Sequence, residues 1–419
     1  MHVTYLGHAA IMVEAGGSRV LMDPWLTDPT YHGTWWHFPP LELGVRDLPR
    51  IDYLYISHEH PDHFDPPTLG QLDKNIQVLI PRFRKRRLHD RLTSIGFRHI
   101  NEIPYHTDFA CGASGLTLRL IAPDRAWDDS AMLLRHGDVT VLNVNDCHLA
   151  EATLCELGRE HAIDLAFLTF TGASQYPGCF DFPLGSKIER ALYSKRSHLE
   201  EFVNWARLLN TKRAVPAAGN HALLAEDQLF LNTPMYANTP ADAIDALRIG
   251  APEIEGLQMN PGDTWTPANG HVRHRPAPDW SRRMEVIEEL SAVVRAREAE
   301  YFASEAPAPA DLYERFVAYF DGALASDPAI APRINLCVWW TVTGSQGGEW
   351  VIDFRRRSGW VDRGVPDYWN LHITIPDKLV YKGVVGEGVW DDIILSFRVR
   401  LARRPDRFMK EFWTWFSKL

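Results

Sequence analysis

The sequence predicts a mixed α/β protein with one large core and an appended C-terminal region. Near the N-terminus, short apolar or alternating runs at residues 2–6, 11–14 and 19–22 are cut by turns, a pattern typical of β-hairpins. Helical patterns separate some of the later strand-like runs, and a length of 419 residues exceeds that of a typical single domain. The later strand-like runs lie at residues 53–56, 77–80, 116–121, 131–134, 139–144 and 165–169.

The last third of the sequence has a different character. Helical patterns cover residues 281–302 and 310–324, and a Trp- and Val-rich segment at 334–353 predicts strands. We therefore expect a first domain at residues 1–280 and an α/β extension at 281–419 that packs on it. A separate helix is expected at about residues 197–209.

Composition and charge exclude several classes of protein. Hydrophobic residues make up 45% and charged residues 23% of the chain, which is ordinary globular usage and not that of a disordered chain. A net charge of −10 disfavours a broad nucleic-acid-binding face. The apolar runs are too short to cross a bilayer, and no export segment precedes the first strand.

The number and spacing of the five cysteines indicate the redox environment of the protein. They form an odd number with no C-x-x-C pair, which favours a reducing cytoplasm over a disulfide framework. We expect a cytoplasmic protein with a small-molecule substrate and no nucleic-acid or membrane partner. The sequence does not predict the oligomeric state.

The most informative stretch follows the strand at 53–56 and reads H-x-H-x-D-H, formed by His58, His60, Asp62 and His63. In an extended segment, alternation directs His58 and His60 to one side. The turn after them lets Asp62 and His63 address a second position nearby. Four ligand-type residues in this order after a strand are unlike a chance cluster of histidines, and they predict two adjacent metal ions.

Together with the segment 4–9 and Asp23-Pro24, this motif resembles the metallo-β-lactamase superfamily. The resemblance implies an αββα sandwich, here with the α/β extension added, and both metals at one edge of the two sheets. It places a carboxylate that bridges the metals at Asp146, which ends the apolar run at 141–145. An ordinary surface loop is the alternative for Asp146.

One ligand position departs from the superfamily pattern. A third histidine usually precedes the hairpin before the bridging aspartate, but this place holds Asp128-Asp129-Ser130. His106 lies too early, and His136 lies at the other end of the strand. We take Asp129 as the ligand, with Asp128 as the alternative. A carboxylate in place of imidazole adds negative charge, weakens the Lewis acid needed for hydrolysis and favours iron, although manganese is also tolerated.

Three further histidines are candidates for the same site. His221 follows the strand-like segment at 214–217 and a Gly turn, and we expect it to supply the last ligand. His148, two residues after Asp146, is an acid/base candidate, with an ordinary loop histidine as the alternative. We expect His8 and Asp23 to orient ligands or hold strand ends and not to touch metal.

Several segments resemble one branch of the superfamily more closely, the CMP-N-acetylneuraminate hydroxylase family. These segments are Asp23-Pro24-Trp25-Leu26, Gly33-Thr34-Trp35-Trp36, Asp146-Cys147, 172–180, 216–219 and 396–401. That family bears an N-terminal Rieske iron–sulfur domain, whereas this sequence starts at the β-lactamase-like core without the Rieske ligand pairs. The resemblance thus implies an oxidoreductase that takes electrons from an external donor. At His221 the family pattern has an aromatic residue.

Two other features could contact a substrate. Ser174 and Tyr176 lie in a Gly/Ser/Tyr-rich loop after a strand, and Trp36 lies in a long loop after Asp23. A well-packed loop and a core anchor are the alternatives. The basic run at residues 82–87 could attract an anionic substrate, but we expect a solvated helix face there and assign no site to it.

These observations support three hypotheses of different classes. The first is a non-haem diiron oxygenase, monooxygenase-like, that hydroxylates a small polar, nucleotide-linked or carrier-linked substrate with O2. The second is a dinuclear zinc or manganese hydrolase of an ester, amide or phosphodiester. The third, a binding module without turnover, is disfavoured because the whole H-x-H-x-D-H motif is present. In the first hypothesis, His58, His60 and Asp129 hold one iron, Asp62, His63 and His221 hold the other, Asp146 bridges, and Asp146 and His148 are the catalytic candidates.

Overall fold

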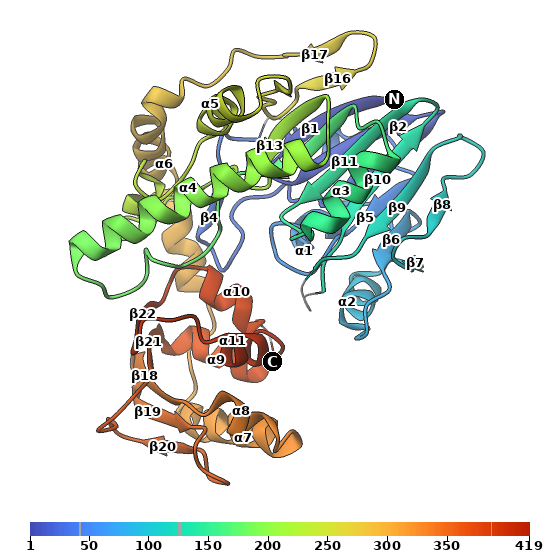
Figure 1. Cartoon of the computed structure of the whole chain (residues 1–419). Helices are drawn as coiled ribbons and strands as arrows, with labels where there is room; N and C mark the ends of the chain where they lie inside the picture. Colours follow the sequence, from blue (N-terminus) through green and yellow to red (C-terminus); the bar gives the residue numbers. More distant parts are fainter. Residues whose placement is uncertain (42, 125–127, 387) are drawn as a thin grey trace. The chain divides into compact units, whose positions relative to one another are not determined.

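The computed structural model describes residues 1–41, 43–124, 128–386 and 388–419, which form two compact units (Figure 1). The first unit comprises Met1–Thr30, Trp35–Gly172 and Leu192–Ser291. The second comprises Tyr31–Thr34, Ala173–Ala191 and Ala292–Leu419. Two short segments from the first half of the chain therefore belong to the second unit. The domain boundary suggested near residue 280 stays a prediction.

The first unit contains an eight-stranded sheet with the order β17-β16-β1-β2-β3-β5-β6-β7. Its strands are β1 (His2–Gly7), β2 (Ala10–Ala15), β3 (Ser18–Met22), β5 (Tyr53–Tyr55), β6 (Gln77–Pro81), β7 (His99–Ile103), β16 (Thr264–Thr266) and β17 (Gly270–Val272). The first three strands form the antiparallel meander expected from the sequence, whereas β3, β5, β6 and β7 are parallel. As a result, β1, β3, β5, β6 and β7 all end at the same edge.

The second sheet of this unit has seven strands in the order β15-β13-β12-β11-β10-β9-β8. They are β8 (Asp108–Ala110), β9 (Thr117–Ile121), β10 (Ala131–His136), β11 (Val139–Asn145), β12 (Leu165–Thr169), β13 (Arg213–Ala217) and β15 (Glu255–Gly256). The expected hairpin joins β10 to β11 through Gly137, whose φ is +57°. Because β11, β12 and β13 are parallel, their carboxyl ends share one edge with the amino end of β10.

Apolar side chains define four layers in this unit (Figure 1). One buried cluster lies between the sheets and includes Tyr5, Val13 and Phe167. A second packs the outer face of the eight-stranded sheet against α1 (Pro66–Gln71) and α2 (Arg87–Ile95). A third packs the outer face of the seven-stranded sheet against α3 (Glu151–Glu160), α4 (Leu184–Leu208) and α5 (Pro240–Gly250). This arrangement confirms the predicted αββα sandwich.

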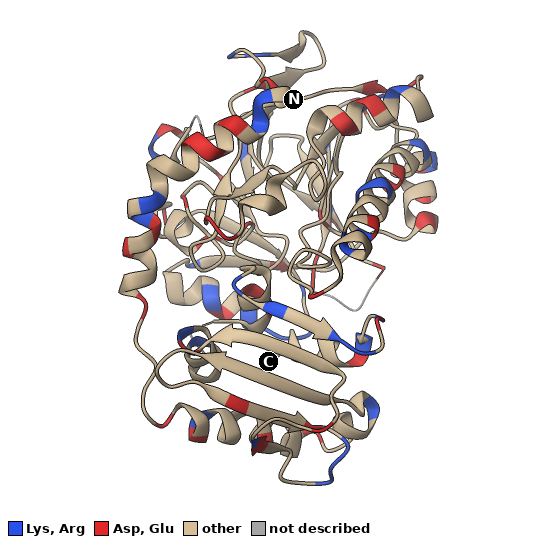
Figure 2. Cartoon of the chain, turned by 90° about the vertical axis from the view of Figure 1, so that its left-hand side faces the viewer, with Lys and Arg blue, Asp and Glu red and all other residues tan. Residues whose placement is uncertain are grey.

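The second unit is built on a five-stranded sheet with the order β20-β19-β18-β21-β22. The strands are β18 (Cys337–Thr343), β19 (Gly348–Asp353), β20 (Val361–Arg363), β21 (Leu371–Pro376) and β22 (Arg400–Arg403). The packing helices are α7 (Leu312–Ser326), α8 (Ile330–Ile334), α9 (Asp377–Val385), α10 (Trp390–Leu395) and α11 (Lys410–Phe416). Large aromatic rings such as Phe320, Trp340 and Trp390 fill its core. In Figure 2 most of this sheet is drawn tan, and β18 and β21 carry no Lys, Arg, Asp or Glu.

Two sequence expectations differ from the structure. The basic run is not a helix face, because α2 begins only at Arg87 and the preceding cations lie in the loop after β6. The helix expected at 197–209 begins earlier, at Leu184. Its first part exposes Leu192 and Tyr193, so it lacks the regular apolar stripe from which a helix is predicted. Among the described residues, no helix is both long and apolar enough to cross a membrane.

A buried ion pair in the second unit yields a stability prediction. Glu305, whose side chain is 2% exposed, accepts hydrogen bonds from Arg398 at 2.6 and 2.9 Å and from Lys382 at 2.8 Å. Burial alone would raise the pKa of Glu305, but the bonds from Arg398 and Lys382 outweigh it and hold the pKa below its ordinary value. The carboxylate therefore stabilises the fold above its unfolded-state pKa, and this contribution disappears as the pH falls through the lower folded-state value.

We expect Glu305→Gln to lower the free energy of unfolding by about 3 kcal/mol at pH 7, because two buried cations lose their counter-charge. The free energy of unfolding is to be measured by urea titration followed by tryptophan fluorescence. The difference between Glu305→Gln and the unmodified protein should disappear below about pH 4. Glu314→Gln removes an exposed pair with Arg363 and is the control, with an effect below about 0.5 kcal/mol. Equal stability of both variants at pH 7 would contradict the assignment.

Candidate metal centre

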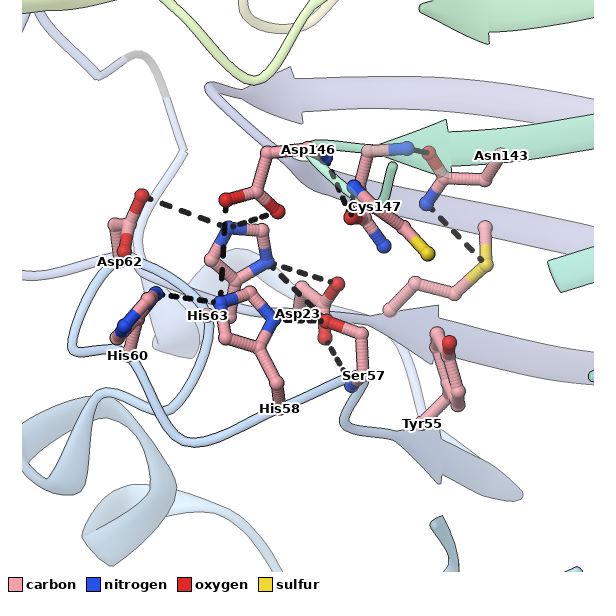
Figure 3. Close-up of polar contacts among 12 residues, drawn as sticks. Asp23, Tyr55, Ser57, His58, His60, Asp62, His63, Asn143, Asp146 and Cys147 are labelled. Carbon is pink, nitrogen blue, oxygen red and sulfur yellow. Dashed lines mark hydrogen bonds and ion pairs between the residues drawn. The ribbon is translucent and has the colours of Figure 1, made fainter. Parts of the chain in front are cut away.

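Six strand ends of the sandwich bring acidic and imidazole side chains to one edge of the first unit (Figure 3). The parallel strands of both sheets end there, so residues distant in sequence become neighbours. His8 follows β1, Asp23 follows β3, His58, His60, Asp62 and His63 follow β5, Asp129 precedes β10, Asp146 follows β11, and His221 opens β14 (His221–Leu223) shortly after β13.

The backbone turns sharply at four of these strand ends. His8, Asp23, Asn145 and Ala218 have φ values of +48°, +43°, +48° and +52°, in the left-handed region that residues other than glycine rarely adopt. Such residues cost roughly 1–3 kcal/mol each and cluster at functional sites. Hydrogen bonds hold them in place, among them Ala218 N–H to His8 O at 3.0 Å. The strain is therefore concentrated at this edge.

The first group of candidate ligand atoms surrounds the His58 ring. Its Nε2 lies 2.9 Å from His60 Nδ1 and 3.9 Å from Asp146 Oδ2. Two imidazole nitrogens and one carboxylate oxygen thus converge, a donor set that suits zinc, iron or manganese. His58, His60 and Asp146 thus lie together, and their role as metal ligands stays a prediction.

A second group lies on the other side of Asp146. His63 Nε2 is 3.2 Å from Asp146 Oδ1 and 3.5 Å from Asp62 Oδ2. Asp62 Oδ2 in turn lies 2.8 Å from His8 Nε2. Ligand atoms of His8, Asp62 and His63 fall within 4.8 Å of one another, as do those of His58, His63 and Asp146. The two Asp146 oxygens therefore face different groups, which is the placement required of a bridging carboxylate.

Neighbouring side chains fix the orientation of these rings. Asp23, which is fully buried, accepts a hydrogen bond from Ser57 N–H at 2.8 Å and lies 3.0 Å from His63 Nδ1. Ser57 Oγ lies 2.9 Å from His58 Nδ1. A partner at Nδ1 leaves Nε2 of each imidazole free to bind a cation. Asp23 thus has the orienting position expected from the sequence.

Asp129 also lies at the His58 ring, on the Nδ1 side. Its Oδ1 is 3.3 Å from His58 Nδ1, and its side chain is 14% exposed. Tyr105 O–H donates to the Asp129 carbonyl at 2.7 Å, which ties this segment to the site. The contact is made to the ring nitrogen opposite the one that faces His60 and Asp146. In this arrangement the carboxylate orients His58, and its role as a ligand stays a prediction.

The acidic and imidazole groups of this cluster shift one another's pKa values. Burial lowers the pKa of His63, but Asp146, Asp62 and Asp23 together hold it well above its ordinary value. Burial raises the pKa of Asp62, and the adjacent His63 and His8 hold it well below the usual range. His63 Nε2 and Asp146 Oδ1 are buried without a hydrogen-bond partner among the described residues. Buried carboxylates around unsatisfied nitrogen and oxygen atoms fit divalent cations, which would replace the proton.

His221 lies on the His8 side of the site. Its ring stacks on Trp35 at 3.8 Å and lies 5.9 Å, centroid to centroid, from the ring of His8. Burial holds its pKa well below the ordinary value, so the ring stays neutral and able to bind a cation. His8 occupies the position beside Asp62. In the sequence, the only signal for this position of His8 was the segment Gly7-His8-Ala9. The role of His221 as a metal ligand stays a prediction.

The remaining predicted residues have other surroundings. His148 lies 3.8 Å from Glu201 and against the edge of Trp205, both on α4. Trp36 is buried in β4 (Trp35–His37), where its backbone pairs with that of Ala222. Ser174 and Tyr176 belong to the second unit, where the Ser174 hydroxyl accepts a hydrogen bond from Tyr176 N–H. Their roles in catalysis or substrate binding stay predictions.

The comparisons with known proteins identify the domain that carries this site. Residues 2–148 match the model of a family described as a beta-lactamase superfamily domain. This match confirms the resemblance of the N-terminal motifs to that superfamily.

Relatives that match most of the chain indicate which branch of the superfamily it resembles. A protein of Mycobacterium tuberculosis named as a Rieske 2Fe-2S iron–sulfur protein is 28% identical over 355 residues, which span 80% of this chain and 66% of the relative. Cytidine monophosphate-N-acetylneuraminic acid hydroxylase of Danio rerio is 24% identical over 462 residues, spanning 99% and 71%. These matches confirm the closer resemblance stated above. The chain spans just under two thirds of the mycobacterial relative.

A solved structure shows a weaker likeness. CmlA, a diiron β-hydroxylase from Streptomyces venezuelae, is 18% identical, with 62% of this chain and 53% of that chain covered at a TM-score of 0.43. At this score the likeness does not bear on the reaction.

The position of Asp23 leads to a test of ring orientation. In Asp23→Asn the amide can donate to His63 Nδ1, which would place the remaining ring proton on Nε2 and block that ligand atom. We expect the affinity for Fe²⁺ or Zn²⁺, measured by competition with a chromogenic chelator, to fall about 10- to 100-fold. Asp52→Asn, which also removes a carboxylate from a backbone N–H, that of Arg19, is the control. Unchanged affinity in a folded Asp23→Asn protein would refute the orienting role.

Proposed function

We propose that this protein is a non-haem diiron oxygenase, monooxygenase-like, that hydroxylates a small polar, nucleotide-linked or carrier-linked substrate with O2 and electrons from an external donor. The observation that carries the proposal is the segment Asp128-Asp129-Ser130 before β10, where the superfamily pattern usually has a histidine. A carboxylate-rich pair of sites favours iron over zinc. The near full-length match to a protein named as a hydroxylase supports the same reaction type.

The proposed ligand set follows the two groups of atoms around Asp146. His58 and His60 serve one position, with Asp129 as the carboxylate of that position, and Asp62 and His63 serve the other. Asp146 faces both. His8 stands closest to Asp62 among the remaining histidines, and His221 lies behind it. The activation of dioxygen is what an iron pair bound to this set supplies.

The residues of the chain have the other roles in this proposal. Asp23 and Ser57 hold the imidazole rings so that Nε2 points to the cations. Buried side chains around His63 and Asp62 exclude water, which strengthens the attraction between carboxylate and cation. The five cysteines are free, which supports a reducing, cytoplasmic location.

A dinuclear zinc or manganese hydrolase of an ester, amide or phosphodiester is the second candidate. The contact that favours it is that of Asp129, because the carboxylate meets Nδ1 of His58 and not the nitrogen that faces His60. If Asp129 only orients this ring, the cation beside His58 keeps an open position and less negative charge. That state suits a Lewis acid that activates water.

Metal content separates the two candidates. We expect protein purified without added metal to contain about two iron ions per chain and to show a visible-region ferric absorption. Asp129→His should shift the bound metal towards zinc by restoring a neutral imidazole, as measured by elemental analysis and by loss of the ferric absorption. Asp138→His, in the exposed β10–β11 turn, adds a histidine outside the site and should leave the iron content unchanged.

Two results would overturn this proposal. Two zinc ions in the unmodified protein would favour the hydrolase. Retention of iron and ferric absorption in Asp129→His would show that Asp129 does not set the metal preference.

A further inference from the structure

A cavity of about 460 Å³ in the first unit lies apart from the candidate metal ligands. Its walls come from four segments, namely the loop after β6, the first turn of α2, the edge strand β7 and the start of β8. The chain crosses here from the eight-stranded sheet to the seven-stranded sheet. The volume falls within the range of small-molecule sites.

The strand register places this cavity on the functional side of the sheet. Strands β5, β6 and β7 are parallel, with Tyr55 beside Leu79 and Leu79 beside Asn101. The lining residues Arg82 and Ile103 thus lie at the carboxyl ends of β6 and β7. With about 4.8 Å between strands, the cavity flanks the end of β5 at a distance of roughly 10 Å.

The charge of the cavity is positive in a chain whose net charge is −10. Arg82 donates a weak 3.4 Å hydrogen bond to the Glu102 carbonyl and has no carboxylate partner within the described ranges. Arg86 lies 3.9 Å from the Glu102 carboxylate and donates to the ring of His89 at 3.0 Å. Of these two arginines, only Arg86 has a carboxylate neighbour among the described residues, and at 3.9 Å that ion pair is loose.

The second acid in the wall is already neutralised. Asp108 accepts hydrogen bonds from Arg119 and Arg135, both at 2.6 Å. The bond from Arg119 is the main reason why the pKa of Asp108 is lowered, so this carboxylate stays ionised. Arg119 and Arg135 lie outside the lining, so within the wall Arg82 and Arg86 face the Glu102 carboxylate, and one positive charge remains for a ligand.

The wall beside these cations is apolar. Ile103 is buried, Ile100 and Phe109 are half-buried, and Phe109 is held edge-on to Tyr53 at 6.0 Å. A bare inorganic anion would leave this surface uncovered. An anion attached to an apolar or aromatic group would use both parts of the cavity.

We propose that this cavity binds a phosphorylated small molecule, with the phosphate on Arg82 and Arg86 and the organic group against Ile100, Ile103 and Phe109. Arginine suits the phosphate because its planar fork can donate two hydrogen bonds to one phosphate group. The site is independent of the reaction proposed for the metal centre. Helix α2 nevertheless touches both, because Arg87 and Arg91 bind Glu59 of the metal loop at 2.7 and 3.1 Å.

Isothermal titration of the full chain with phenyl phosphate tests this inference, with inorganic phosphate and phenol as the partial ligands. We expect phenyl phosphate to bind at least tenfold more tightly than either. The variant R82Q/R86Q should weaken its binding at least tenfold. The control R84Q/K85Q removes two charges from the same loop outside the cavity and should change the dissociation constant less than twofold.

Three results would overturn the inference. They are an equal loss in both double variants, no binding of phenyl phosphate, and loss of binding after metal is removed with a chelator, which would place the anion at the metals. Thr107→Glu puts a carboxylate into the cavity from an exposed position, so it gives a second test if R82Q/R86Q does not fold. It should also weaken binding at least tenfold, and unchanged binding would count against the site.

Discussion

The structure of the first unit depends on one electrostatic constraint, the grouping of three carboxylates around the buried His63 ring. Asp23 and Asp62 are buried, and the Asp146 side chain is 35% exposed. Asp23, Asp62 and Asp146 all lie within 3.5 Å of this ring, two of them at Nε2 and one at Nδ1. A single imidazolium does not balance three carboxylates in a site that excludes water. Bound cations would balance the excess negative charge of this cluster. Without a counter-charge, the same carboxylates would be unfavourable in a protein core.

The sandwich topology brings these charged side chains together, and it does so at one edge of the first unit. Parallel strands deliver the motif after β5, the ligand-orienting Asp23 after β3 and the bridging candidate Asp146 after β11 to one edge. The left-handed backbone at His8 and Asn145 turns the chain abruptly there, at a cost that the packed layers on either side must cover. Elsewhere in the sandwich, the layers are held mainly by apolar contacts.

The sequence predicted the parts of the fold that local patterns determine. Alternation and motif spacing predicted the strands β1–β3, β5, β6 and β9–β12, the hairpin between β10 and β11 and the clustering of His58, His60, Asp62 and His63. They did not predict the strands β4, β7 and β8. Contacts between distant strand ends could not be predicted in this way. No local pattern shows that His8 lies beside Asp62, or which nitrogen of His58 the Asp129 carboxylate meets, because both depend on how two sheets pack. The cavity beside β7 could not be predicted for the same reason. The loop cations form a cavity wall only together with residues 100–109, which lie next to them in the fold.

The central claim is that the strand ends grip two adjacent cations, and diffraction from crystals grown with Fe²⁺ tests it most directly. Anomalous difference maps recorded on either side of the iron edge should show two iron peaks about 3.5–4 Å apart. One peak should contact His58 and His60, the other Asp62 and His63, with Asp146 between them. A single peak, or none at this edge of the sandwich after loading, would contradict the account.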